Sequence, residues 1–332
     1  MRVGTLERRY KTHMQPNKTW RLRTTTLDLT QPVVMGILNV TPDSFSEGCQ
    51  YQDVNDDEKF SIDLDAFAET AEHMIRSGAK LLDVGGESTR PGADPIGEEE
   101  ELRRVIPAVR TLVKRFDTPI SVDTYRPAVA AAALEEGAAI VNDVGAGRFV
   151  SAEERFADLN HPAEREEMAE VVARYDAAVI LVHMDGTPKT MQNNLVERGP
   201  RIVDEVFEFL AKRRDAFIKT GVDPARIAYD PGIGFGKTFE ENRTLNLGIA
   251  RLLSLGPVLV GHSRKSFLKE IARKRFARLK EPYRAPSVIA LDFLTAQLSA
   301  TLATRGVNIL RVHNVEATDF ALELLRARKE PY

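Results

Sequence analysis

The sequence predicts an α/β fold, namely a single (β/α)8 TIM barrel with a short N-terminal β-ribbon extension. Eight strand–helix units follow one another from residue 33 onward, and eight is the number that closes such a barrel. The strands are nearly continuous runs of Val, Ile and Leu, which are typical of a parallel sheet covered by helices. The length of 332 residues also fits one large barrel, since barrels of this kind hold about 250 residues or more.

Each predicted strand is a short apolar run that leads into polar residues. In chain order the strands lie at 32–40, 80–86, 119–123, 138–144, 177–183, 226–230, 256–263 and 307–313.

A helix is predicted after each strand, and several helices carry their own start and stop signals. The first ends at Gly78, and the third begins near Pro127 and ends at Gly137. The second has four glutamates, Glu98 to Glu101, in its first turn, where the helix dipole favours negative charge. The clearest helices are 64–78, 97–116, 126–137, near 200–219, and 316–329.

The domain organisation predicted from these units is an extension, 1–30, followed by the barrel, 31–330. The Thr-rich stretch 19–29 favours a β-ribbon within the extension. A targeting peptide is the alternative for this basic segment, which however lacks serine and a clear amphipathic helix. An open doubly wound sheet is the alternative fold, but the first strand continues into NVTPDSF rather than a glycine fingerprint.

Composition excludes several classes of function. A net charge of −3 argues against an overall attraction to nucleic acid, and we expect no nucleic-acid partner. The single cysteine, Cys49, excludes an intrachain disulfide and a Cys-rich zinc site. No apolar run predicts a membrane span or a signal peptide, so we expect a cytoplasmic location and no membrane partner. The basic run 273–284 then fits a solvated helix face or a subunit edge.

The stretch DPGIGFGKT, 230–238, resembles a phosphate-binding loop at first sight. The Walker pattern would need glycine at position 231, where the chain has Pro231, and the dinucleotide pattern would need a third glycine at Lys237. Neither nucleotide motif is present. The glycines must instead allow a close approach of backbone, and Lys237 is expected to be solvated or to stabilise the loop.

Polar residues follow all eight apolar runs, and the barrel would bring them to one rim, where such enzymes place their chemistry. Carboxylates and an amide without a nearby arginine suit a flat heterocycle with several N–H donors. Cations at the last two strand ends suit a diphosphate, and a Mg²⁺ ion could bridge its oxygens. The rim residues are Asn39, Asp83, Asp123, Asn142, His183, Asp230, Ser263, Arg311 and His313, with Arg264 and Lys265 beside them.

Eight motifs in order resemble those of the dihydropteroate synthase family between about residue 33 and residue 316. They read MGILNVTPDSFS, LLDVGGESTRPGA, SVDT, VNDV, HMDGTPKTMQ, DPGIGFGK, GHSRKS and ILRVH. The resemblance implies a TIM barrel that condenses p-aminobenzoate with 6-hydroxymethyl-7,8-dihydropterin diphosphate, giving 7,8-dihydropteroate and pyrophosphate. It also implies a Mg²⁺ cofactor, a homodimer with the interface near 273–284, and a dissociative reaction in which diphosphate leaves before the aniline nitrogen attacks.

The resemblance carries residue roles onto matching positions. The residues with a direct part in the chemistry would be Asp123, Lys265, Arg311 and His313. The pterin would contact Asp123, Asn142, Met184, Asp230, Phe235 and Lys265. The diphosphate would contact Asn39, Thr89, Arg311 and His313, and Asn39 would also bind the metal. The p-aminobenzoate would contact Thr89, Arg90, Pro91, Phe235 and Ser266.

Three positions depart from the family pattern, and the charged segment 151–176 is longer than the family leads us to expect. Asn314 stands where an aspartate is usual after the histidine, Asp185 stands where a glutamine is common, and 285–288 replaces a usual Gly-Ser. Two other functions stay open. A pterin-binding methyltransferase barrel should lack the cations of SRK and RVH, and a catalytically silent pterin-binding paralogue should have lost loop or cation residues.

Overall fold

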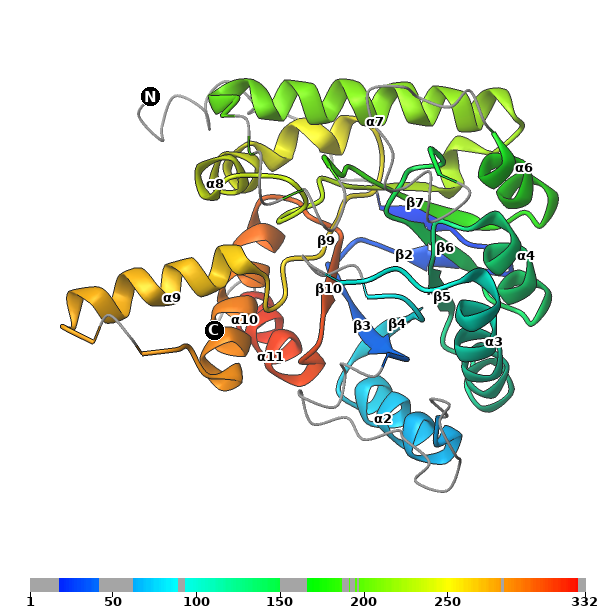
Figure 1. The fold of residues 1–332 in the computed structure, drawn as a ribbon, viewed down its shortest axis with the longest axis horizontal. Helices are drawn as coiled ribbons and strands as arrows, with labels where there is room; N and C mark the ends of the chain where they lie inside the picture. The colour runs from blue at the N-terminus through cyan, green and yellow to red at the C-terminus, as the bar shows by residue number, and fades with distance from the viewer. Residues whose placement is uncertain are drawn as a thin grey trace.

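The computed structural model describes residues 18–41, 62–88, 93–149, 166–186, 191, 195, 197–281 and 284–327. Eight parallel strands form its central sheet (Figure 1). They are β3 (Val33–Asn39), β4 (Ala79–Gly85), β5 (Ile120–Asp123), β6 (Ile140–Asp143), β7 (Ala178–Val182), β8 (Ile227–Asp230), β9 (Leu259–Val260) and β10 (Ile309–Val312).

The sheet is closed by a short contact between its two outer strands. The strand order is β8-β7-β6-β5-β4-β3-β10-β9, which leaves β8 and β9 at the ends. A parallel bridge pairs Tyr229 of β8 with Val258, and the N–H of Tyr229 donates to the carbonyl of Pro257 at 2.9 Å. The predicted barrel is therefore confirmed, and the open doubly wound sheet is wrong.

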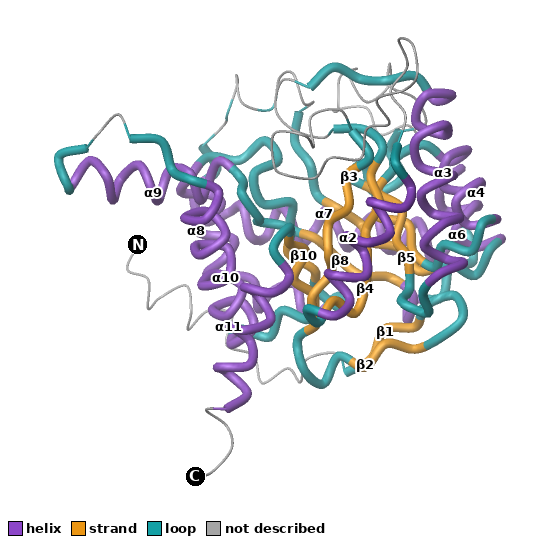
Figure 2. Tube along the Cα trace, turned by 90° about the horizontal axis from the view of Figure 1, so that it is seen from below, coloured by secondary structure: helices purple, strands orange, loops and turns teal. Residues whose placement is uncertain are grey.

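Helices surround the sheet and follow the strands as the apolar periodicity predicted (Figures 1 and 2). Where both ends are described, their bounds differ from the predicted ones by one or two residues, and Gly97, Phe116 and Arg126 are examples of residues that cap a helix instead of belonging to it. The α-helices are α2 (Leu64–Arg76), α3 (Glu98–Arg115), α4 (Pro127–Glu135), α6 (Glu167–Arg174), α7 (Ile202–Lys219), α8 (Phe239–Gly248), α9 (Ser266–Arg278), α10 (Val288–Thr304) and α11 (Val315–Ala327).

Two of the predicted helix ends depend on glycine. Gly78 and Gly137 both have φ of +106°, a backbone conformation that residues with a Cβ rarely adopt. The structure describes residues 166–176 of the charged segment 151–176. Helix α6 occupies most of these described residues. Within the described parts of the chain, no helix is both long and apolar enough to cross a membrane.

The ribbon in the N-terminal extension packs onto one end of the barrel. Strands β1 (Thr19–Arg21) and β2 (Thr26–Asp28) pair antiparallel, as predicted (Figure 2). The Trp20 side chain is fully buried, and its indole N–H donates to the carbonyl of Arg226 at 3.0 Å. Arg226 in turn donates to the carbonyl of Leu22 at 2.7 Å. Because Trp20 belongs to the same apolar cluster as Met35 and Ile309 of the strands, the ribbon extends the core of the barrel.

A buried ion cluster links Glu87, just after β4, with Ile96, just before α3. The Arg126 guanidinium, 2% exposed, pairs with Glu87 at 3.0 Å and also with Glu101. It donates to the carbonyl of Ile96 at 2.6 Å, and the N–H of Ile96 donates to Glu87 at 3.3 Å. One side chain therefore holds both the start and the end of the segment that carries Ser88 and leads to α3.

We predict that Arg126→Leu lowers the free energy of unfolding by about 3–5 kcal/mol, because it leaves two buried carboxylates without their cation. Chemical denaturation of the two proteins measures the difference. Arg110→Leu is the matched control, since Arg110 pairs with Glu136 at 2.7 Å on the exposed surface. Its cost should be much smaller, because an exposed ion pair contributes little to stability. Equal costs for the two variants would contradict this account of the cluster.

Candidate active site

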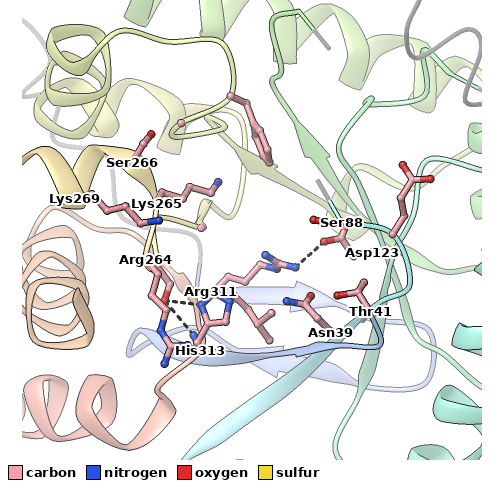
Figure 3. A pocket seen from close by; sticks show the side chains of 16 residues that line it. Asn39, Thr41, Ser88, Asp123, Arg264, Lys265, Ser266, Lys269, Arg311 and His313 are labelled. Carbon is pink, nitrogen blue, oxygen red and sulfur yellow. Dashed lines mark hydrogen bonds and ion pairs between the residues drawn. The ribbon is translucent and has the colours of Figure 1, made fainter. Parts of the chain in front are cut away.

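A pocket of about 380 Å³ opens at the carboxyl ends of the strands (Figure 3). Its polar lining comes from five strand ends or the loops after them and from the start of α9, so distant segments of the chain meet there. The lining residues are Ile37, Asn39, Thr41, Glu87, Ser88, Asp123, Gly234, Phe235, Gly261, Ser263, Arg264, Lys265, Ser266, Lys269, Arg311 and His313.

The guanidinium of Arg311 lies between two carboxylates in the floor of this pocket. Its Nε donates to Asp83, and one of its terminal nitrogens donates to Asp123 at 2.7 Å (Figure 3). Both carboxylates stabilise the cation, and the pKa of Arg311 is raised although burial opposes this. The prediction that Asp123 has no compensating arginine nearby is therefore wrong. It failed because β10 and β5 are far apart in sequence but meet across the barrel.

Asp83 also orients Asn142. The amide nitrogen of Asn142 donates to Asp83 at 3.0 Å, and this contact leaves the amide oxygen free of partners among the described residues. The second carboxylate oxygen of Asp83 is likewise buried and unpaired there. Buried oxygens without donors are costly unless a ligand supplies N–H groups. The sequence placed Asp83 on the rim but gave it no role, although an aspartate within an apolar strand was a signal for one.

Asp230 lies beside this group at the end of β8. Its carboxylate accepts from the N–H of Gly232 at 2.7 Å, and its second oxygen lies 3.5 Å from a Cβ built on Gly261. Burial raises the pKa of Asp230, while the nearby Lys265 lowers it. Gly261 lines the pocket and has no side chain, so the Asp230 carboxylate behind it lies close to the pocket wall.

The loop 230–238 needs its three glycines for conformation and for space. Gly232, Gly234 and Gly236 have φ of +66°, +86° and +65°. A Cβ on Gly232 would lie 1.8 Å from the carbonyl oxygen of His183. The glycines therefore allow the close backbone approach that the sequence predicted, although here the backbone approaches another strand end.

Lys237 holds this loop together from inside. Its ammonium donates to the carbonyls of Gly232 and Phe235 at 3.0 Å and to that of His183 at 3.3 Å. Burial lowers the pKa of Lys237 to about 7. The loop-stabilising role predicted for Lys237 is confirmed, and the alternative of a solvated side chain is wrong.

Lys265 and Phe235 form one wall of the pocket. The ammonium of Lys265 lies 4.0 Å from the centre of the Phe235 ring and donates to the carbonyl of Ile233 at 2.7 Å. Burial lowers the pKa of Lys265 to about 8, and the Asp230 carboxylate opposes this shift. Met184 is buried nearby in the barrel cluster that includes Phe235, but it is not part of the pocket lining.

On the other side of the pocket, His313 contacts Ser263. Its Nδ1 lies 2.9 Å from the Ser263 hydroxyl, and its backbone N–H donates to the same oxygen at 3.2 Å. Arg264, which has φ of +58°, turns away and pairs with Asp292 at 2.7 Å. The Asp292 carboxylate therefore offsets much of the positive charge that Arg264 was expected to contribute to the diphosphate site.

Asn314 has a structural role in this region. Its amide oxygen accepts from the N–H of Ala317, which caps α11, and its amide nitrogen donates to Asp292 at 3.1 Å. An asparagine satisfies both contacts, because it offers an acceptor and a donor together. The departure from the family pattern at this position is thus accommodated by Asp292.

A resident metal ion would find few protein ligands here. Among the described residues, no group of three or more His, Cys, Asp or Glu side chains is arranged to hold a metal. Asn39 and Asp123 both line the pocket, and the Asn39 Oδ1 and an Asp123 carboxylate oxygen lie 3.5 Å and 3.8 Å from a Cβ built on Gly85. A Mg²⁺ ion that takes most of its ligands from phosphate and water fits this donor set.

The structure brings together many of the predicted site residues. Asn39, Asp123, Phe235, Lys265, Ser266, Arg311 and His313 line the pocket, while Asn142, Met184 and Asp230 lie buried behind its lining. Thr89, Arg90 and Pro91 lie outside the described residues. The sequence missed Thr41, Glu87, Ser88 and Lys269; of these, only Lys269 had a signal, its place one helical turn after Lys265.

Several known proteins are similar to this chain in sequence and in fold. A model of the family described as "Pterin binding enzyme" matches residues 35–313. A dihydropteroate synthase of Synechocystis sp. is 39% identical over 285 residues, which cover 86% of each chain. The structure of Xanthomonas albilineans dihydropteroate synthase with 4-aminobenzoic acid has a TM-score of 0.74 at 35% identity and covers 95% of this chain and 100% of that one. That of Burkholderia cenocepacia dihydropteroate synthase complexed with 7,8-dihydropteroate has a TM-score of 0.74 at 32% identity and covers 95% and 98%.

We predict that Gly232→Ala lowers the free energy of unfolding by at least about 3 kcal/mol, because the new Cβ would clash with backbone that cannot move independently. Thermal or chemical denaturation measures the change. Gly221→Ala serves as the control, since Gly221 also has positive φ, +107°, and a Cβ there meets no described atom within 4 Å. Its cost should be about 1–2 kcal/mol from conformation alone. A Gly232→Ala variant no less stable than the control would refute the steric explanation.

Proposed function

We propose that this chain, which belongs to the pterin-binding enzyme family and within it to the dihydropteroate synthases, joins p-aminobenzoate to 6-hydroxymethyl-7,8-dihydropterin diphosphate and releases pyrophosphate. One observation supports this most directly. Unpaired buried oxygens of Asp83 and Asn142 lie in the barrel interior, and cations line the pocket beside them. A ring rich in N–H donors that carries an anionic leaving group fits such a combination.

The pterin ring is proposed to bind at the deep end of the pocket. Asp123, Asn142 and Asp230 would accept hydrogen bonds from the aminopyrimidinone edge. Lys265 would donate to the ring carbonyl, and Phe235 and Met184 would contact the ring surface. The support is the oxygen-rich composition of this end, where Asp83 fixes the orientation of the Asn142 amide.

The diphosphate is proposed to lie towards Asn39 and His313, with Arg311 between it and the ring. As the bond to the methylene carbon breaks, charge accumulates on the leaving oxygen, and fixed donors stabilise that charge. His313 is held by Ser263, so one ring nitrogen is already oriented. Asp123 would meanwhile favour the positive charge that spreads into the pterin. No residue needs to act as a covalent nucleophile.

Mg²⁺ is the cofactor that we propose for this pocket. Asn39 would supply a neutral oxygen ligand, while diphosphate oxygens and water would supply the others. When bound, the ion would neutralise negative charge on the diphosphate. This role suits the chain, because the charge of Arg311 is already shared by two carboxylates.

The acceptor amine is proposed to enter at the open side of the pocket. Phe235 and Ser266 are in position to frame a small aromatic ring there, and Thr89, Arg90 and Pro91 are proposed to contribute from the preceding loop. Two relatives support this substrate pair, since one is solved with 4-aminobenzoic acid and another with 7,8-dihydropteroate.

The two alternative functions are less well supported. A methyltransferase barrel should lack cations at the last two strand ends, whereas Lys265, Arg311 and His313 line this pocket. A silent paralogue should have lost site residues, but Asn314, the departure nearest the pocket, keeps its contacts through Asp292.

We predict that the purified protein releases pyrophosphate only when both substrates and Mg²⁺ are present, and that Arg311→Lys lowers kcat/KM about 100-fold. Lysine keeps the charge, but its single ammonium cannot hold two carboxylates as a planar guanidinium does. An assay for released pyrophosphate measures both effects. No release despite tight binding of the pterin diphosphate would refute the synthase and favour the silent paralogue.

We also propose a homodimer, with its interface on α10 and α11. Ile289, Phe293, Phe320 and Leu324 are between 63% and 82% exposed on these two packed helices. Ile289, Phe293 and Phe320 also line a surface cavity of about 430 Å³. Apolar side chains gathered in this way are typical of a protein–protein contact. The run 273–284, where the sequence placed the interface, is basic, and its described residues, 273–281 and 284, are mostly exposed.

We predict that Phe293→Asp converts the dimer into a monomer, because it places a charge in the centre of the apolar face. Light scattering coupled to size-exclusion chromatography measures the mass. Leu279→Asp is the matched control, since Leu279 is 47% exposed at the end of the basic run. A dimer lost only in the Leu279 variant would return the interface to 273–284, and a monomeric wild type would contradict the proposal altogether.

A further inference from the structure

The open side of the pocket carries a lysine to which nothing above assigns a role. Lys269 lies four residues after Lys265 on α9, so the two side chains share a helix face. Both line the pocket, and both extend into it from the same side (Figure 3). Lys265 is half-buried, whereas Lys269 is exposed. Lys269 therefore places a positive charge at the entrance rather than in the interior.

The other long cations of the pocket already have partners. Arg311 is shared by Asp83 and Asp123, Arg264 pairs with Asp292, and Lys265 donates to a carbonyl while it covers Phe235. The Lys269 ammonium forms no hydrogen bond or ion pair with any residue that the structure describes. It is thus the pocket cation best able to take an incoming anion.

The shape of the acceptor indicates which anion reaches this lysine. Its amine must approach the methylene next to the buried ring, and its carboxylate, on the opposite side of the benzene ring, must then point towards the entrance. Glu87, which also lines the pocket, would repel a carboxylate, but Arg126, 3.0 Å away and shared with Glu101, offsets part of this charge. The start of α9 adds a favourable dipole on the side of Lys269.

We propose that Lys269 recognises the carboxylate of p-aminobenzoate and selects anionic over neutral aromatic amines. This inference rests on the proposed function and adds a specificity residue to it. Lys269 acts on binding of the acceptor and has no part in the departure of diphosphate. Its contribution should therefore fall on the KM for p-aminobenzoate and leave kcat nearly unchanged.

The test compares p-aminobenzoate with its methyl ester in wild type and in Lys269→Gln. We expect Lys269→Gln to raise the KM for p-aminobenzoate about three- to fivefold, because an exposed ion pair contributes only modestly to binding. Lys269→Glu should raise this KM further, because it replaces attraction by repulsion. The KM for the neutral ester should be the same in wild type and in Lys269→Gln. Arg273→Gln is the matched control, because it removes a charge from the exposed surface of α9 outside the pocket lining.

Each other result would overturn the proposal. An unchanged KM for p-aminobenzoate in Lys269→Gln would show that the lysine has no part in binding. Equal increases for acid and ester would indicate a structural effect, and an increase confined to the pterin diphosphate would assign Lys269 to the leaving group. Absence of turnover in wild type would instead refute the proposed function. Calorimetric titration of p-aminobenzoate into wild type and Lys269→Gln would still decide whether the lysine binds the carboxylate.

Discussion

The pocket depends on one partly buried guanidinium, that of Arg311, which is shared by Asp83 and Asp123. Two carboxylates in a barrel interior would be prohibitively costly without a cation between them. The barrel makes this possible, because β10 and β4 both flank β3, and a long side chain from β10 can reach across to β4 and β5. The Asp83 oxygen that accepts from Arg311 also accepts from the Asn142 amide, so one ion cluster also sets the orientation of a residue on β6.

A second constraint comes from the loop 230–238, which forms the neighbouring wall. Its left-handed glycines bring carbonyl oxygens to the buried ammonium of Lys237, and those oxygens would otherwise lack donors. Asn242 adds to this by accepting from the N–H of Gly234 at 2.7 Å. These hydrogen bonds hold the loop in one conformation, and the loop therefore presents Phe235 to the pocket in a fixed position. Without this rigidity, Lys265 would lose the ring and the carbonyl of Ile233 that hold it.

Most of the fold could be predicted from the sequence, because apolar runs and helix caps are local signals. The strands ending at Asn39, Asp123 and Asp230 were found in this way, and the barrel then implied that these ends meet. The partners of individual side chains could not be predicted. Arg311 lies 188 residues from Asp123, and Lys237 follows a glycine-rich turn that looks solvent-exposed in sequence. Both depend on how separate segments pack, which neither periodicity nor spacing encodes.

The distribution of charge connects the site to the proposed chemistry. Arg311 contributes little net charge to a leaving group, because two carboxylates already balance it, and Arg264 is balanced by Asp292. A pyrophosphate leaving group would therefore find less positive charge than the count of basic residues suggests. Asn39 would offer the proposed Mg²⁺ ion a neutral oxygen ligand, and the bound ion would add positive charge beside the leaving group. Arg311 offsets the charge of the carboxylates in the pocket floor, while buried oxygens of Asp83 and Asn142 stay without a donor among the described residues. In the proposed reaction these oxygens would be left to bind the pterin, and the metal ion would offset most of the charge of the leaving group.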